Sequence, residues 1–180
     1  MLIDDFMLNH DFSEKHEIDI RATAEKVYEA VNSVNLADSW VIWGLLSLRG
    51  LGRSSGKTLT LRDMTKEGFA ILDEKPNEEI LLGLAGKFWS ATGCLQEINA
   101  ENFRAFDKKG FAKAAWNFVL TETGGNEIRL TTETRVQCLD KESQANFRFY
   151  WRFIKPFSGW IRNEMLRLIK EKAENEIDND

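Results

Sequence analysis

The feature that most constrains the fold is a helical pattern of apolar residues within residues 147–173. One face of the helix would carry Phe147, Trp151, Ile154, Ile161, Met165 and Leu168. A face of this size needs a large apolar partner, and the segments before it have the alternation of strands. The pattern therefore predicts a long C-terminal helix lying across a sheet. Pro156 lies within it and predicts either a kink or a break near residue 155.

The rest of the chain reads as a first strand, a short helical region and then a run of antiparallel strands. Alternating residues 12–21 predict a first strand, Thr23 can cap a helix after it, and a second short helical turn is expected at residues 36–40. Further strands are predicted at residues 58–64, 69–74, 79–85, 103–106, 112–123 and 127–139. Strands and helices segregated in this order indicate an α+β architecture.

Length and composition set the class of protein. At 180 residues we expect a single domain spanning residues 1–180, with a less ordered leading segment at 1–11 and a less ordered acidic tail at 176–180. The 24 basic and 29 acidic residues give a net charge of −5, which argues against a nucleic-acid partner.

Several common sites have no support in the sequence. Cys94 and Cys138 stand far apart without a Cys/His cluster, so neither a metal site nor a disulfide framework is predicted, and no cofactor motif is visible. No serine lies in a GxSxG elbow. The N-terminus lacks a signal-peptide pattern and no run of eighteen apolar residues occurs, so a cytoplasmic location without stable membrane insertion is expected.

Several stretches together carry a resemblance to a known superfamily. They are residues 48–51, 83–89, 112–118, 131–136, 150–151, 158–159 and 161–162. With the order of elements, they resemble the START-like superfamily, also called Bet v 1-like or SRPBCC and including polyketide cyclase/dehydrase-type proteins, and within it a bacterial subgroup of unassigned function. The resemblance implies a helix-grip fold, in which a curved antiparallel sheet wraps around a long C-terminal helix after two short helices. It also implies an elongated apolar cavity between helix and sheet.

Candidate ligand-binding residues follow from the inward faces of that arrangement. They are Trp40, Trp43, Trp89, Trp116, Phe118, Thr132, Thr134, Phe147, Trp151 and Ile154. Trp116 and Trp151 could equally be core residues. Trp40 and Trp43 could form either a cavity entrance or the hydrophobic seam under a glycine- and serine-rich loop.

Two polar candidates receive structural interpretations. Glu133 and Arg135 share a strand face with other polar side chains, which favours a solvated cross-strand charge ladder over a catalytic pair. His16 shares the parity of Ile18 and Ile20 and could point inward, but a structural role near a strand end is favoured because no partner is visible.

Three functions remain open. The first is binding of a small hydrophobic ligand, such as a lipid, polyketide or aromatic molecule, in the cavity. The second is a cyclase, aromatase or hydrolase that acts in the same cavity, with catalytic residues that the sequence does not identify. The third is a protein-interaction module without a ligand, using exposed aromatic residues such as Trp40, Trp43 or Trp160. The sequence does not indicate the oligomeric state.

Overall fold

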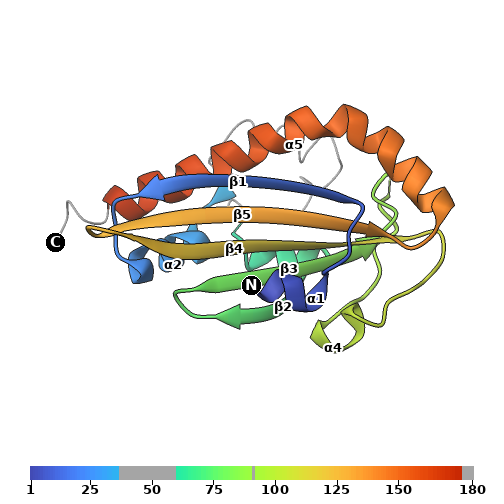
Figure 1. The fold of residues 1–180 in the computed structure, drawn as a ribbon, viewed down its shortest axis with the longest axis horizontal. Helices are drawn as coiled ribbons and strands as arrows, with labels where there is room; N and C mark the ends of the chain where they lie inside the picture. Colours follow the sequence, from blue (N-terminus) through green and yellow to red (C-terminus); the bar gives the residue numbers. More distant parts are fainter. Residues whose placement is uncertain (37–59, 91, 176–180) are drawn as a thin grey trace.

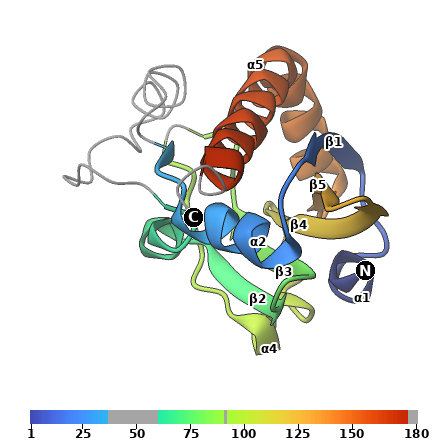
Figure 2. The same cartoon turned by 90° about the vertical axis from the view of Figure 1, so that its left-hand side faces the viewer.

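The computed structural model describes residues 1–36, 60–90 and 92–175 and contains one antiparallel sheet. Its spatial order is β1-β5-β4-β3-β2, with each strand antiparallel to its neighbours. The strands are β1 (Phe12–Ile20), β2 (Ala70–Lys75), β3 (Glu79–Gly86), β4 (Ala112–Gly124) and β5 (Glu127–Cys138). The sheet curves under the C-terminal helix α5 (Lys141–Asn175), as Figures 1 and 2 show. This is the α+β helix-grip architecture that the sequence predicts.

Local turn chemistry fixes the two hairpins of the sheet. Between β4 and β5, Gly124, Gly125 and Asn126 all adopt positive φ angles, which glycine and asparagine accept more readily than other residues. Asn77 does the same between β2 and β3. The turn between β4 and β5 sets the register that pairs Trp116 of β4 with Thr134 of β5.

Helix α5 begins earlier than the apolar pattern predicts because residue 140 caps it. The Asp140 carboxylate accepts a hydrogen bond from the backbone N–H of Ser143 at 2.7 Å, which satisfies one of the free donors of the first turn. The helix then continues through Pro156 without a break. Figure 1 shows its axis changing direction midway, so the proline produces a bend and not two helices.

Helix α2 (Ala24–Ser33) completes the layer that covers the inner face of the sheet. The Thr23 hydroxyl accepts from the backbone N–H of Lys26 at 3.4 Å, as expected for a cap. The apolar side of α2 packs against the C-terminal half of α5 and the sheet. The core there includes Val27, Val31, Leu130, Leu166 and Ile169. The second short helix expected at residues 36–40 lies almost entirely outside the described residues.

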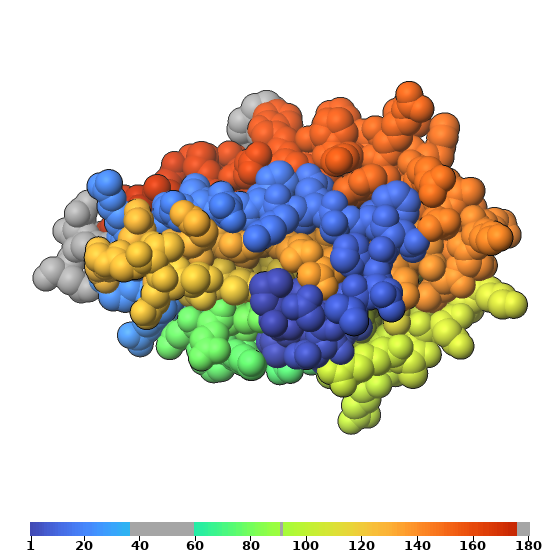
Figure 3. Space-filling view, viewed as in Figure 1, coloured from blue at the N-terminus to red at the C-terminus, as the bar shows by residue number. Residues whose placement is uncertain are grey.

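The outer face of the sheet carries a second layer that the sequence did not predict. Helix α1 (Leu2–Phe6) lies against it, and Figure 3 shows this dark blue segment seated on the sheet. Ile3 is fully buried among Leu81, Phe103 and Ala115. The leading segment, expected to be less ordered, is therefore packed through residue 7. The acidic tail at 176–180 lies outside the described residues.

Two predicted strands are not strands where the structure describes them, because each segment lies in a turn beside a short helix. Residues 103–106 follow α4 (Ala100–Phe103), whose Asn99 side chain accepts hydrogen bonds from the backbone N–H groups of Glu101 and Asn102. The described part of 58–64 leads into the 3₁₀-helix η3 (Asp63–Glu67). There the Asp63 carboxylate accepts from both the N–H and the hydroxyl of residue 60, an arrangement that competes with strand pairing.

The Glu133 and Arg135 pair is not a solvated ladder. Arg135 is only 8% exposed because α1 covers it. Its guanidinium donates to the Glu133 carboxylate at 2.6 Å, to the Asp4 carboxylate at 2.8 Å and to the Met7 carbonyl at 3.1 Å. The prediction was wrong because strand alternation identifies a face but not what packs on it. The pair holds α1 to the sheet.

Candidate functional site: a cavity under the C-terminal helix

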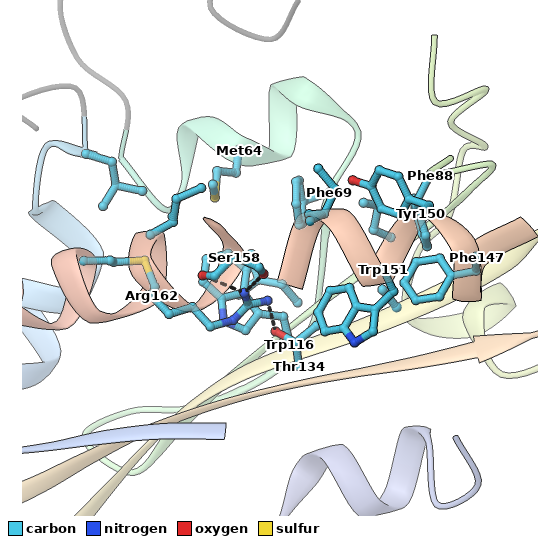
Figure 4. Close-up of a pocket in the computed structure, with 17 residues that line it drawn as sticks. Met64, Phe69, Phe88, Trp116, Thr134, Phe147, Tyr150, Trp151, Ser158 and Arg162 are labelled. Atoms are coloured by element: carbon cyan, nitrogen blue, oxygen red, sulfur yellow. Dashed lines mark hydrogen bonds between the residues drawn. The ribbon is translucent and has the colours of Figure 1, made fainter. Parts of the chain in front are cut away.

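A cavity of about 230 Å³ lies between α5 and the inner face of the sheet. Helix α5 contributes Phe147, Tyr150, Trp151, Ile154, Ser158, Ile161, Arg162 and Met165, and the strands contribute Leu82, Leu84, Ala114, Trp116 and Thr134. Leu36, Met64, Phe69 and Phe88 complete the described lining. The helical spacing that defined the C-terminal pattern thus places one continuous stripe of α5 over the cavity (Figure 4).

The ten candidate residues fall into three groups. Five line the cavity: Trp116, Thr134, Phe147, Trp151 and Ile154. Three do not: Phe118 is buried in the core between the sheet and the helices, Thr132 is buried against Trp116, and Trp89 lines a depression beside α5 that shares Tyr150 and Ile154 with the cavity. Trp40 and Trp43 lie outside the described residues.

One end of the cavity is aromatic. The Phe147 ring stacks on Trp151 at a centroid distance of 5.7 Å and 20° between the ring planes. Phe12 at 4.9 Å and Phe88 at 6.2 Å pack on the same ring at steeper angles. Figure 4 shows Phe147, Trp151 and Phe88 together at this end. Such packed rings form a rigid apolar wall.

Trp116 forms the floor, and Thr132 fixes its orientation. The indole N–H donates to the Thr132 hydroxyl at 2.7 Å, and this hydroxyl donates to the Asn117 carbonyl at 2.9 Å. The polar edge of the tryptophan is therefore satisfied inside the sheet. What remains for the cavity is the apolar face of the ring, in contact with Phe69 at a centroid distance of 6.2 Å.

The other end of the cavity holds a buried cation that the sequence analysis missed. The Arg162 guanidinium donates to the Thr134 hydroxyl at 2.8 Å, to the Ser158 carbonyl at 3.2 Å and to the Ser158 hydroxyl. Its side chain is 14% exposed. Burial lowers the pKa of the guanidinium, because desolvation disfavours its charged form. An arginine nevertheless stays protonated at neutral pH.

Glu14 of β1 is the counter-charge nearest to Arg162, but the two groups pair poorly. One carboxylate oxygen, Oε2, lies 3.5 Å from the Arg162 Nη1 and has no hydrogen-bond partner within the described ranges. The other, Oε1, lies 2.9 Å from His16 Nε2. Within the same ranges, the Arg162 Nε also lacks a partner. The carboxylate is thus divided between a histidine, with which it makes a hydrogen bond, and an arginine, with which it makes none.

Gly159 allows the helix to come this close to β1. A Cβ atom at this position would lie 2.9 Å from Glu14 Oε1 and 3.5 Å from His16 Cε1. Because any side chain would displace these groups, the glycine sets the spacing between α5 and the edge strand. His16 therefore faces the helix, as its parity predicts, and its partner is the carboxylate two residues earlier on the same strand face.

A sequence signal for Arg162 did exist. The residue lies four positions after Ser158 and eleven after Trp151, so it shares the cavity-facing side of the helix. A charge on the apolar side of a helix, with serine one turn before it, indicates a buried polar site. Glu14 carries a comparable signal, a charge at a position with the inward parity of His16 and Ile18, although its partner comes from a distant part of the chain.

The outer side of α5 carries a different set of aromatic residues. Phe149, Phe153, Phe157 and Trp160 recur at helical spacing and are 70%, 58%, 49% and 49% exposed. Phe149 and Phe153 are in edge contact at 5.1 Å. This outer aromatic row faces away from the cavity and is separate from its lining.

The described part of the chain contains neither a metal-binding cluster nor a membrane-spanning helix. In residues 1–36, 60–90 and 92–175, no group of three or more His, Cys, Asp or Glu side chains is arranged to hold a metal ion. Over the same ranges, no helix has the length and apolar character needed to cross a membrane.

Comparison with known proteins finds similarity at the level of fold. No family model and no curated protein matches the chain. A conserved protein of Geobacillus kaustophilus aligns with 90% of this chain and 95% of its own, at 12% identity and a TM-score of 0.48. The Zhui aromatase/cyclase of Streptomyces sp. R1128 aligns with 92% of this chain and 95% of its own, at 10% identity and a TM-score of 0.32.

A third similar structure is a larger protein. The di-domain aromatase/cyclase BexL from the BE-7585A biosynthetic pathway aligns with 91% of this chain but 47% of its own, at 10% identity and a TM-score of 0.37. At such identities the similarity concerns the fold alone, so the function has to be argued from the cavity.

Proposed function

We propose that the protein binds a small hydrophobic molecule in the cavity between α5 and the sheet. The observation that supports this most is the cavity itself, about 230 Å³ in volume and lined mainly by aromatic and aliphatic side chains. Protein interiors are close-packed and contain few voids larger than a water molecule, whose share of liquid volume is about 30 Å³. An apolar hollow several times this size beneath a helix is more typical of binding proteins than of a closely packed core.

The size of the cavity limits the ligand. Sites for drug-sized molecules usually measure roughly 300–1,000 Å³. At about 230 Å³ the described cavity favours a smaller ligand, such as a bicyclic aromatic molecule or a medium-length acyl chain. The aromatic wall formed by Phe147 and Trp151 would contact the faces of such a molecule.

Binding is favoured over catalysis by the polar groups that the cavity contains. Arg162 stays protonated and cannot act as a general base at neutral pH, and it already engages the hydroxyls of Thr134 and Ser158. The imidazole of His16 contacts the Glu14 carboxylate and is not part of the described lining. An enzyme acting in this cavity would need a general acid or base in contact with the ligand, and among the described lining residues Tyr150 would have to fill that role.

The test is to fill the cavity. Ala114 lies on β4 with its side chain toward the void, so Ala114→Phe would place a ring inside it. Binding would be followed by the fluorescence of the neutral probe N-phenyl-1-naphthylamine. We expect the wild type to bind it and Ala114→Phe to bind it at least tenfold more weakly, while the thermal midpoint stays within a few degrees because the ring occupies empty space.

The matched control is Ala145→Phe, the same change at an exposed position of α5. It should leave probe binding unchanged. If the wild type does not bind the probe, or if Ala114→Phe binds it as well as the wild type does, the cavity is not the binding site and the proposal fails.

A further inference from the structure

The Arg162 guanidinium is incompletely paired inside an apolar cavity. A buried arginine opposite a carboxylate usually makes two parallel hydrogen bonds with it. Here the nearest Glu14 oxygen lies at 3.5 Å and accepts no hydrogen bond, and within the described residues the Arg162 Nε has no acceptor. The acceptors that do reach the guanidinium are neutral, two on Ser158 and one on Thr134. Within the described residues, the charge therefore has a carboxylate nearby but no anionic hydrogen-bond acceptor, although its burial calls for one.

The position of the guanidinium matches one end of an elongated ligand. Arg162 lines the same cavity as Ile154, eight residues earlier on the helix, and Trp151, eleven residues earlier. At 1.5 Å per residue these positions lie about 12 Å and about 16 Å from Arg162 along the helix axis. Figure 4 shows Arg162 between Ser158 and Thr134, with Trp151 and Phe147 beyond it. A ligand lying along α5 would have one end at a cation and its body among apolar groups.

We infer that the ligand is a small hydrophobic carboxylic acid whose carboxylate binds Arg162 and whose apolar body extends toward Ile154 and Trp151. This inference rests on the proposed function and specifies the ligand class for the same cavity. A carboxylate matches the planar fork of a guanidinium and supplies the acceptors that it lacks. A monoanion fits better than a dianionic phosphate, because Glu14 already places a negative charge beside the site and Arg162 is the one cation of the described lining.

The test compares acids with isosteric neutral amides. Octanoate and octanamide form one pair, and 2-naphthoate and 2-naphthamide the other, each titrated into the full chain by isothermal calorimetry in a carboxylate-free buffer. A charge-assisted hydrogen bond contributes roughly 1.5–3 kcal/mol, so the wild type should bind each acid about 10- to 100-fold more tightly than its amide. Arg162→Gln should reduce this ratio to about one while changing amide affinity less than about threefold.

A second variant should change the affinity for the acids in the opposite direction. Glu14→Gln removes the carboxylate that competes for the guanidinium, so it should tighten acid binding severalfold and leave amide binding unchanged. A purely structural Arg162–Glu14 pair would not produce this increase. The matched control is Arg167→Gln, which removes an exposed arginine one turn further along α5 that pairs with Glu164 and Glu171. It should leave both affinities unchanged.

The outcomes separate this inference from the proposed function. If the acids and amides bind the wild type equally well, or if Glu14→Gln weakens acid binding, the assignment of a carboxylate to Arg162 is wrong while cavity binding stands. If the wild type binds none of the four compounds and also fails to bind N-phenyl-1-naphthylamine, both the inference and the proposed function fail. If Arg162→Gln does not fold, the effect of Glu14→Gln on acid binding decides whether Arg162 binds the carboxylate.

Discussion

Phe147 should be one of the most costly positions to truncate on the inner side of α5. Its side chain is 2% exposed and its ring contacts five others, with centroid distances from 4.9 Å to 6.5 Å. Phe→Ala changes in protein cores typically cost about 3–5 kcal/mol of unfolding free energy. Because Phe147 borders a cavity, its neighbours can lean into the space it leaves, so we expect about 3–4 kcal/mol.

The assay is thermal and urea unfolding followed by circular dichroism. For a chain of this length, each kcal/mol shifts the thermal midpoint by roughly 2–4 °C, so Phe147→Ala should lower it by about 10 °C. The control is Phe149→Ala, the same change two residues later on the same helix. Phe149 is 70% exposed, so its truncation should cost less than about 0.5 kcal/mol.

The comparison tests which side of α5 faces the sheet. If the two variants differ by less than about 1 kcal/mol, the aromatic end of the cavity is not packed as described. A larger cost for Phe149→Ala would mean that the outer aromatic row, and not the stripe containing Phe147, is buried in solution.

Other predictions concern titration and thiol reactivity. Burial and, to a smaller extent, a hydrogen bond to a carboxylate raise the pKa of Tyr28 from 10.0 to about 12. The stabilisation that Tyr28 contributes should therefore be complete below pH 10 and disappear as the pH rises through 12. In urea unfolding at high pH, Tyr28→Phe should not show this decrease in stability. The hydrogen bond from Arg135 lowers the pKa of Asp4 below 3.8, so the stability gap between wild type and Asp4→Asn should be present above pH 3.8 and should close as the pH falls through the lowered value. Burial raises the pKa of the Cys138 thiol to about 12, whereas hydrogen bonds from neighbouring hydroxyls lower the pKa of the exposed Cys94 thiol. Maleimide at neutral pH should therefore modify Cys94 first. Equal rates of modification would contradict the described burial of Cys138.

The main elements could be predicted because their patterns are long and periodic. The stripe from Phe147 to Leu168 and the alternation around Trp116 and Thr134 each depend on many residues, so a few exceptions do not hide them. The layer formed by α1 and α4 could not be predicted in this way. Helix α1 has five residues, too few to display a period, and its burial depends on contacts with β3 and β4, far along the chain.

The cavity could be predicted only in part, for a related reason. Periodicity indicates which face of an element points inward, and so it indicated Trp116, Phe147 and Trp151. Periodicity does not indicate whether an inward side chain reaches the cavity. Phe118 and Thr132 were therefore candidates, although Phe118 packs in the core and Thr132 lies against Trp116. The polar end depends on groups from β1, β5 and α5 that meet only in the folded chain.

The layer on the outer face of the sheet has a consequence for how this protein can change over time. Strands β3 and β4 contribute side chains to an apolar cluster on each side, and the outer cluster, around Ile3, Leu81 and Phe103, has no residue in common with the cavity lining. Substitutions in the cavity therefore leave the apolar packing on the outer side of these strands intact. A lineage could vary the residues around Trp151 and acquire new ligands while the sheet keeps its shape. Amide hydrogen exchange would show this separation as protection of β3 and β4 that survives substitution of the cavity lining.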